Sequence, residues 1–226
     1  MAAYVIAPPP VVSVKVAGGG DFPVRRVFCV GRNFAAHVRE MGGDPDRETP
    51  FFFTKPADAL VTDGAPMPYP PATSELHHEM ELVVAIGTGG AAIPAEAAMA
   101  HVFGYAAGLD MTRRDLQAAA KKAGKPWDMA KGFDASAPIG TITRAAPDFA
   151  HARIALCVNG VLRQESTLAH MIWTVPEIIA HLSALVTLAP GDLVFTGTPE
   201  GVAATVRGDV LEGAIDGVGE VRTQIA

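Results

Sequence analysis

The feature that most constrains the fold is a set of short apolar runs, each bounded by turn residues. Their length of six or seven residues and their Val, Phe and Ile content favour β-strands over helices. The Asn159-Gly160 pair suits a type I′ hairpin turn, which predicts two paired strands within residues 154–165. The runs are RVFCVG (26–31), PFFFTK (50–55), ELVVAIG (81–87), IALCVNG (154–160) and LVFTGT (193–198).

Helical signals are fewer. Thr174, with Glu177 three residues later, forms a capping box and predicts a helix that begins there. Thr112 is predicted to cap a second, Ala-rich helix that Gly124 ends. A short third helix is predicted in NFAAHVREMGG (33–43). Because strands outnumber helices and the two do not alternate regularly, the predicted class is α+β, mostly β, and not a parallel doubly wound sheet.

Composition narrows the possible functions. A net charge of −6 without a basic stripe argues against a nucleic-acid binder. No apolar run reaches the ~20 residues that cross a bilayer, and the N-terminal residues lack the basic start of a signal peptide. Two lone cysteines, Cys29 and Cys157, indicate reduced core residues of a cytoplasmic protein.

The 226 residues favour one large domain. The glycine-rich segment VAGGGDFPVRR (16–26) is interpreted as a turn that joins an N-terminal strand to the main body. Residues 1–25 are therefore predicted to be an extension packed on that body, and residues 26–226 a single catalytic domain.

In LHHEMELVVAIG (76–87), two glutamates stand at the start of a segment that is predicted to be buried. On a strand, Glu79 and Glu81 point to the same face, where two unpaired buried carboxylates would cost several kcal/mol. A divalent cation would remove this cost, and Asp110, after another apolar run, is a third candidate ligand. Carboxylates with water are the ligands that Mg²⁺ or Mn²⁺ prefers.

Two other interpretations of this segment stay open. The Glu-x-Glu pair also occurs on solvated strand edges. His77 and His78 suggest zinc, but no Cys or His lies at a spacing that completes a zinc site, so packing or support of the ligands is favoured for the two histidines.

His37 and Glu40 lie one turn apart on the short predicted helix. A carboxylate beside an imidazole fixes its tautomer and suits it to act as a general base on water, although such pairs are also common surface contacts. Gly42 and Gly43 follow at once, so this segment is a candidate lid.

Several scattered cations and polar groups suggest a small anionic substrate. Lys131, between apolar neighbours in WDMAKGFD, would hold a carboxylate or a developing negative charge, unless it is an ordinary surface lysine. Arg114 and Gln117 lie one turn apart after the third acid. Lys55 ends a predicted strand, and TGTPEG (196–201) ends another with hydroxyl and backbone donors.

Together these segments resemble the fumarylacetoacetate hydrolase family, and within it the short single-domain fumarylpyruvate and acylpyruvate hydrolases. The resemblance runs from about Val27 onward. Its segments are GRNFAAHVREMG, PFFFTKPADAL, LHHEMELVVAIG, GYAAGLDMTRRDLQ, KPWDMAKGFD, VNGVLRQ, MIWTVPEIIAHLS and LAPGDLVFTGTPEGV.

The resemblance implies a mixed β-sandwich roll with a few short helices, assembled as a homodimer. It implies Mg²⁺ or Mn²⁺ on Glu79, Glu81 and Asp110. It further implies the site roles that follow: His37 and Glu40 as the water-activating pair on a lid helix, Lys131 as the catalytic lysine, and Lys55, Arg114, Gln117 and Thr198 as substrate-binding residues.

The implied reaction is hydrolysis of a carbon–carbon bond in a 2,4-dioxo acid. Fumarylpyruvate, which gives fumarate and pyruvate, is the expected substrate, and catabolism of aromatic compounds the expected setting. Alternatives that keep the same metal site are an oxaloacetate decarboxylase and a hydroxymuconate-type isomerase. A non-catalytic cation-binding domain would not need His37, Glu40 and Lys131 together.

Overall fold

The computed structural model of the protein describes residues 4–40 and 49–226. The helices are α1 Ala35–Glu40, α2 Arg114–Lys122, α3 Asp128–Lys131 and α4 Val175–Leu185, with 3₁₀ turns η1 Ala57–Ala59, η2 Ala95–His101 and η3 Leu168–His170. The strands are β1 Ser13–Lys15, β2 Asp21–Pro23, β3 Arg26–Gly31, β4 Phe51–Lys55, β5 Leu60–Val61, β6 Leu76–His77, β7 Met80–Ile86, β8 Val102–Leu109, β9 Thr112–Arg113, β10 Ala137–Pro138, β11 Arg153–Val158, β12 Val161–Thr167, β13 Asp192–Phe195, β14 Ala204–Thr205, β15 Val210–Ile215 and β16 Gly219–Gln224.

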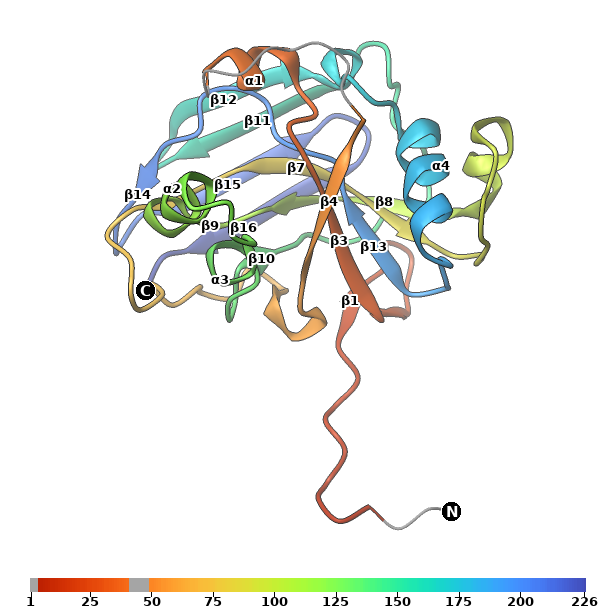
Figure 1. The fold of residues 1–226 in the computed structure, drawn as a ribbon, viewed down its shortest axis with the longest axis horizontal. Coiled ribbons are helices and arrows are strands. Elements are labelled where there is room, and N and C mark those ends of the chain that lie inside the picture. The colour runs from red at the N-terminus through yellow and green to blue at the C-terminus, as the bar shows by residue number, and fades with distance from the viewer. Residues whose placement is uncertain (1–3, 41–48) are drawn as a thin grey trace.

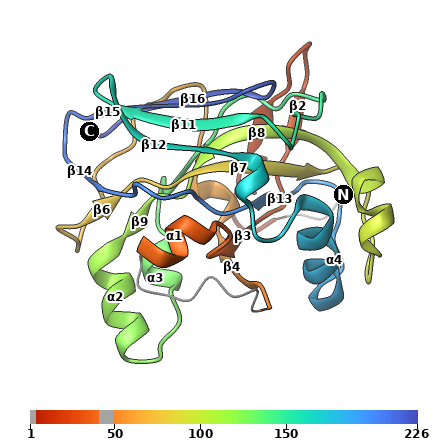
Figure 2. The same ribbon diagram turned by 90° about the horizontal axis from the view of Figure 1, so that it is seen from above.

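Two sheets form the body of the molecule. One has the order β4-β3-β13-β7-β8, in which only the β3–β13 pair is parallel, and the other has the antiparallel order β12-β11-β15-β16. Figures 1 and 2 show α2 and α3 together at one side of these sheets and α4 at the opposite side. The mostly β class is confirmed, and each of the five predicted apolar runs forms a strand.

Strand β7 is buried along its whole length because both faces of its sheet are covered. Leu82 and Val84 face the core shared with β11 and β15, where they join Leu156 and Leu211. Val83 and its neighbours on the same face join a second cluster under β1, β2 and β10. The sheet therefore holds β7 rigidly. Of the predicted ligands, Glu81 lies in this strand and Glu79 lies one residue before it.

Local sequence signals explain several element ends. Asn159 and Gly160, with φ of 52° and 76°, make the predicted left-handed turn between β11 and β12. Glu177 accepts a hydrogen bond from the Thr174 amide at 2.9 Å, which confirms the capping box of α4. The predicted cap of α2 is wrong: Thr112 lies in β9, and Arg113 occupies the N-cap position.

The N-terminal segment is more structured than its glycines suggest. Gly18, Gly19 and Gly20 all have positive φ, so they form a turn between β1 and β2, and part of the predicted loop is strand. Val14 and Phe22 of this hairpin are buried in the second core cluster. Among the described residues, no helix has both the length and the apolar character needed to cross a bilayer.

The β11–β12 hairpin offers a matched test of how the core is packed. Leu156 on β11 is 0% exposed, whereas Leu162 on β12 is 44% exposed. Leu156→Ala should lower the free energy of unfolding by about 2–5 kcal/mol, because it leaves a cavity between the sheets. Leu162→Ala should change it by less than about 0.5 kcal/mol. Urea denaturation measures both, and equal losses would contradict this packing.

Candidate active site

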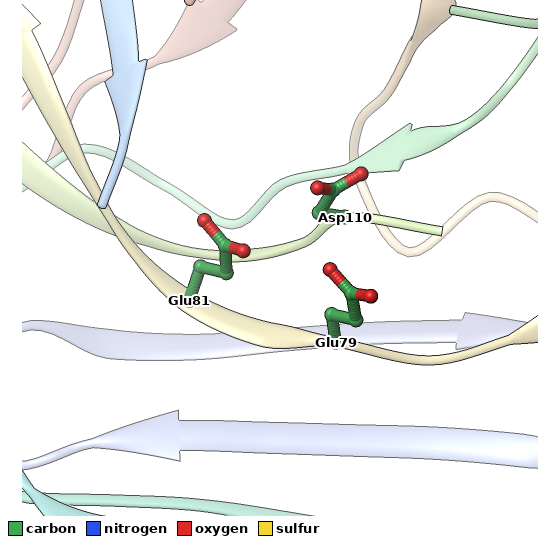
Figure 3. A group of neighbouring side chains, drawn as sticks. All are labelled: Glu79, Glu81 and Asp110. Carbon is green, nitrogen blue, oxygen red and sulfur yellow. The ribbon is translucent and has the colours of Figure 1, made fainter. Parts of the chain in front are cut away.

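Three buried carboxylates converge at the end of the β7–β8 pair. Met80 pairs with Leu109 and Glu81 with Gly108, and one step further the Asp110 amide donates to the Glu79 carbonyl at 2.9 Å. This register places Glu79 and Asp110 opposite each other, with Glu81 on the same face (Figure 3). Each contributes an oxygen, and these oxygens lie within 4.8 Å of one another.

Three cations surround the carboxylates. The Lys131 ammonium, from α3, contacts Glu79 Oε2 at 2.7 Å and Asp110 Oδ2 at 2.8 Å. Arg114, at the start of α2, contacts the other oxygen of Glu79 at 2.5 Å. Lys55, at the end of β4, contacts Asp110 Oδ1 at 2.8 Å and also donates to the backbone carbonyl of Lys131. All three side chains are thereby fixed against the acids.

The pKa values of the two glutamates are shifted in opposite directions. Burial favours the neutral form of Glu79, but the charges of Lys131 and Arg114 outweigh it and hold its pKa well below the usual range. Burial, with repulsion from Asp110 and Glu79, raises the pKa of Glu81 well above the usual range. Among the described residues, no cation is paired with Glu81, which accepts a hydrogen bond from the Gly197 amide at 2.8 Å. Three buried carboxylates, one of them uncompensated, fit a hard divalent cation.

Helix α1 brings His37 to the cluster, with Glu40 beside it. His37 Nδ1 lies 3.3 Å from Glu40 Oε2, and Glu40 also accepts from the Gly201 amide at 3.1 Å. Nδ1 is directed at this carboxylate, and among the described residues Nε2 has no hydrogen-bond partner, so Nε2 is the ring nitrogen that can act on a water molecule. The predicted helix-ending residues Gly42 and Gly43 lie outside the described residues, and the movement of α1 as a lid stays a prediction.

Most of the predicted site residues line one cavity of about 170 Å³. They are His37, Glu79, Glu81, Asp110, Arg114, Gln117, Lys131 and Thr198. Glu40 and Lys55 are not on its wall: they lie behind His37 and Asp110, respectively, and contact them. The structure therefore brings all ten together, eight on the cavity and two behind it.

Gly197 is needed where β13 leaves the sheet. Its φ is +95°, and a Cβ there would lie 2.7 Å from the Cβ of Asn33. Only glycine turns the chain so closely against this neighbour, and the turn aims its amide at Glu81 and places Thr198 on the cavity wall.

Gln164 on β12 is a supporting residue that the sequence analysis missed. Its Nε2 donates to Thr198 Oγ1 at 2.9 Å, while its Oε1 accepts from the Met80 amide at 3.0 Å. The same oxygen lies 3.0 Å from His78 Nδ1. Gln164 thus ties the start of β7 to the TGTPEG loop. Only the VNGVLRQ segment of the resemblance, which ends at this residue, could have drawn attention to it.

Neither histidine of the LHHEM segment joins the ligand cluster that the described residues form. His78 is fully buried, and its contact with Gln164 supports the predicted packing role. His77 lies 3.1 Å from Glu75 at the surface side of β6. The cluster of potential ligands is purely carboxylate, which is typical of Mg²⁺ or Mn²⁺ and not of zinc.

Fold and site together define a class: a mostly β enzyme with a buried carboxylate centre suited to a divalent cation. The chain belongs to the fumarylacetoacetate (FAA) hydrolase C-terminal family, whose profile matches residues 26–226.

Several relatives cover most of the chain. Fumarylpyruvate hydrolase from Pseudomonas aeruginosa, solved in complex with Mn²⁺ and pyruvate, is 52% identical with a TM-score of 0.95 and 99% coverage of both chains. Fumarylpyruvate hydrolase of Ralstonia sp is 46% identical over 79% of this chain and 93% of its own. The mitochondrial oxaloacetate tautomerase FAHD1 of Rattus norvegicus is 44% identical over 89% of this chain and 91% of its own.

Metal binding can be tested without turnover. Glu81→Gln should abolish most of the stabilisation by Mn²⁺, which for a bound cation at 100 times its Kd is about 2.7 kcal/mol. In EDTA the same variant should be at least as stable as wild type, because a repelled buried carboxylate is replaced by a neutral amide of the same shape.

Thermal unfolding with EDTA or Mn²⁺ measures both effects. Glu212→Gln, an exposed glutamate paired with Arg222 on the other sheet, is the control and should keep the Mn²⁺ shift. A normal Mn²⁺ shift in Glu81→Gln would refute the proposed ligand set.

Proposed function

We propose that this chain is a metal-dependent hydrolase that cleaves a carbon–carbon bond of 2,4-dioxo acids, with fumarylpyruvate as the preferred substrate and fumarate and pyruvate as products. One observation carries the proposal: a single cavity holds the three-carboxylate cluster and a buried His37 that is oriented by Glu40. The 52% identical relative that was solved with Mn²⁺ and pyruvate supports it.

Glu79, Glu81 and Asp110 would hold Mg²⁺ or Mn²⁺. The bound ion would supply Lewis acidity that polarises the 2-oxo acid end of the substrate. The fit rests on the donor set itself: three convergent buried carboxylates, of which Glu81 has no cation of its own among the described residues.

The His37–Glu40 pair performs the proton transfers. His37 takes a proton from water at Nε2, while Glu40 stabilises the resulting imidazolium through Nδ1. The hydroxide adds to the C4 carbonyl of the substrate, and the C3–C4 bond then breaks with its electron pair passing to the pyruvate enolate. The proton held by His37 is then transferred to C3 of the enolate. One water molecule is consumed in all, with its hydroxyl on the carboxylic acid product and its proton on pyruvate.

The polar wall of the cavity binds and orients the substrate. Arg114 and Gln117, held together at 2.5 Å, together with Thr198 present donors toward the bound carboxylate and oxo groups. Lys131 places a positive charge beside the enolate. Its three donors contact Glu79, Asp110 and Thr112, so it exchanges one of these when it binds the enolate oxygen. Lys55 acts from behind Asp110 and orients it.

Oxaloacetate chemistry is a second candidate function. Relatives named oxaloacetate tautomerase are 44% identical over 89% of this chain, and oxaloacetate is also a 2-oxo acid that a carboxylate metal centre can enolise. Tautomerisation or decarboxylation needs no attacking water. The His37–Glu40 pair is the feature that favours hydrolysis over these reactions.

The proposal extends to the domain bounds, the cellular setting and the assembly of the chain. Residues 26–226 act as the single catalytic domain, since no described residue before Val30 lines the cavity. The chain works in the cytoplasm in the catabolism of aromatic compounds, and its two free cysteines are consistent with a reducing compartment. It assembles as a homodimer, which light scattering after size-exclusion chromatography would test.

Turnover of synthetic fumarylpyruvate is the primary test. Loss of its enol absorbance should stop in EDTA and return when Mg²⁺ or Mn²⁺ is restored in excess. Acetylpyruvate and oxaloacetate are assayed in parallel. Metal-dependent loss that is fastest with fumarylpyruvate is the expected result, whereas rapid pyruvate release from oxaloacetate with stable dioxo acids would move the enzyme to the decarboxylases.

His37→Ala separates hydrolysis from enolate chemistry. It should lower hydrolytic kcat by at least about 100-fold, because water loses its general base. Any tautomerisation or decarboxylation of oxaloacetate should be retained in part. His151→Ala, an exposed histidine with its own acidic partner, is the matched control and should leave all rates unchanged. An equal loss of both reactions in His37→Ala would count against the role assigned to this residue.

A further inference from the structure

Beyond the carboxylate cluster, the cavity has an aromatic wall. Phe53 and Trp127 line it, with ring centroids 6.1 Å apart, and Phe51 packs edge-on against Trp127 at 5.2 Å. Flat apolar surfaces suit a planar unsaturated chain better than a polar chain that keeps its bound water. The wall therefore provides a place for a conjugated acyl group next to the catalytic groups.

Two further cations line the same cavity. Arg32 follows β3, and Lys121 lies in the last turn of α2, so two separate elements bring them to one opening. Both are exposed. Unlike Arg114 and Lys131, which contact Glu79, neither has an acidic partner within the described part of the chain.

The backbone is strained where it presents Arg32. Its φ is +60°, a left-handed conformation that costs a non-glycine residue about 1–2 kcal/mol. The preceding Gly31 has no room for a side chain, because a Cβ there would come within 2.0 Å of the Phe51 ring. The chain thus turns sharply against Phe51, whose ring lies 5.9 Å from the Arg32 guanidinium. Such strain concentrates where a side chain has a function.

The charge balance of the cavity gives these cations a role. Glu79, Glu81 and Asp110 are matched in number by Lys131, Arg114 and Lys55. Arg32 and Lys121 are then in excess, before a divalent cation adds further positive charge. A ligand with a carboxylate at each end would meet the cluster with one end and these two cations with the other.

We propose that Arg32 and Lys121 form a second anion-binding subsite, which binds the far carboxylate of the substrate. The inference deepens the proposed function and rests on it: the enzyme selects dioxo acids whose acyl group is planar and ends in a carboxylate. Arg32 and Lys121 are specificity-determining residues, and they take no part in bond cleavage.

The test compares two substrates that differ only at the far end: fumarylpyruvate and its analogue with a methyl group in place of that carboxylate. Arg32→Gln and Lys121→Gln should each lower kcat/KM for fumarylpyruvate roughly tenfold, since each removes one charge-assisted contact. The loss for the methyl analogue should stay within about twofold, because an exposed charge acts weakly at a distance. Arg32→Lys, which keeps the charge, should restore part of the loss.

Lys122→Gln is the matched control. It removes the same charge from the same helix end, but Lys122 does not line the cavity. It should affect neither substrate. Equal losses for both substrates, no loss in either cavity variant, or an equal loss in Lys122→Gln would each overturn the proposal.

A binding measurement separates failure of the subsite from failure of the proposed function. Calorimetry compares fumarate with crotonate, which carries a methyl group in place of one carboxylate. Wild type should bind fumarate more tightly than crotonate. The double variant that combines Arg32→Gln and Lys121→Gln should lose this preference. If wild type hydrolyses neither dioxo acid, the proposed reaction fails, and the fumarate preference alone decides the subsite. No preference in wild type would reject it.

Discussion

The site depends on how three mutually repelling carboxylates are kept buried in one place. Lys131 and Arg114 neutralise Glu79, and Lys55 with Lys131 neutralises Asp110. Within the described part of the chain, the partner of Glu81 is a single backbone amide, that of Gly197. Because an unpaired buried carboxylate is costly, this arrangement leaves a position whose remaining partner is a cation from solution. Metal affinity and local instability of the metal-free centre thus have the same cause.

The two sheets make this arrangement possible. Strand β7 is buried on both faces and cannot move to relieve the repulsion among the acids at its N-terminal end, and its register with β8 fixes which acids meet. Gly197 then closes the site from β13, where its positive φ aims an amide at Glu81. The fold contributes rigidity: the carboxylates lie at the ends of β7 and β8, and α1, α2 and α3 bring His37, Arg114 and Lys131 to them.

Local patterns were predictable from the sequence, whereas contacts between distant segments were predictable only where the buried acids or the family resemblance indicated them. Strand runs, the Asn159-Gly160 turn and the Thr174 capping box depend on neighbouring residues, so their signals are complete within a few positions. The position of Lys55 behind Asp110 depends on how β4 lies relative to β8, which periodicity does not encode. Thr112 failed as a helix cap because its hydroxyl accepts from Lys131, a tertiary contact that overrides local preference.

Partners, more than residue type, decide what each cation of the cavity can do. Arg114 and Arg32 line the same space, yet the first is fixed against Glu79 and the second stacks near Phe51 with no acid beside it among the described residues. A paired cation stabilises the site and sets the charge of its neighbours. An unpaired cation held by a strained backbone keeps its charge available for a ligand. The residues that build the metal centre, such as Arg114, are thereby distinct from those that determine substrate specificity, such as Arg32.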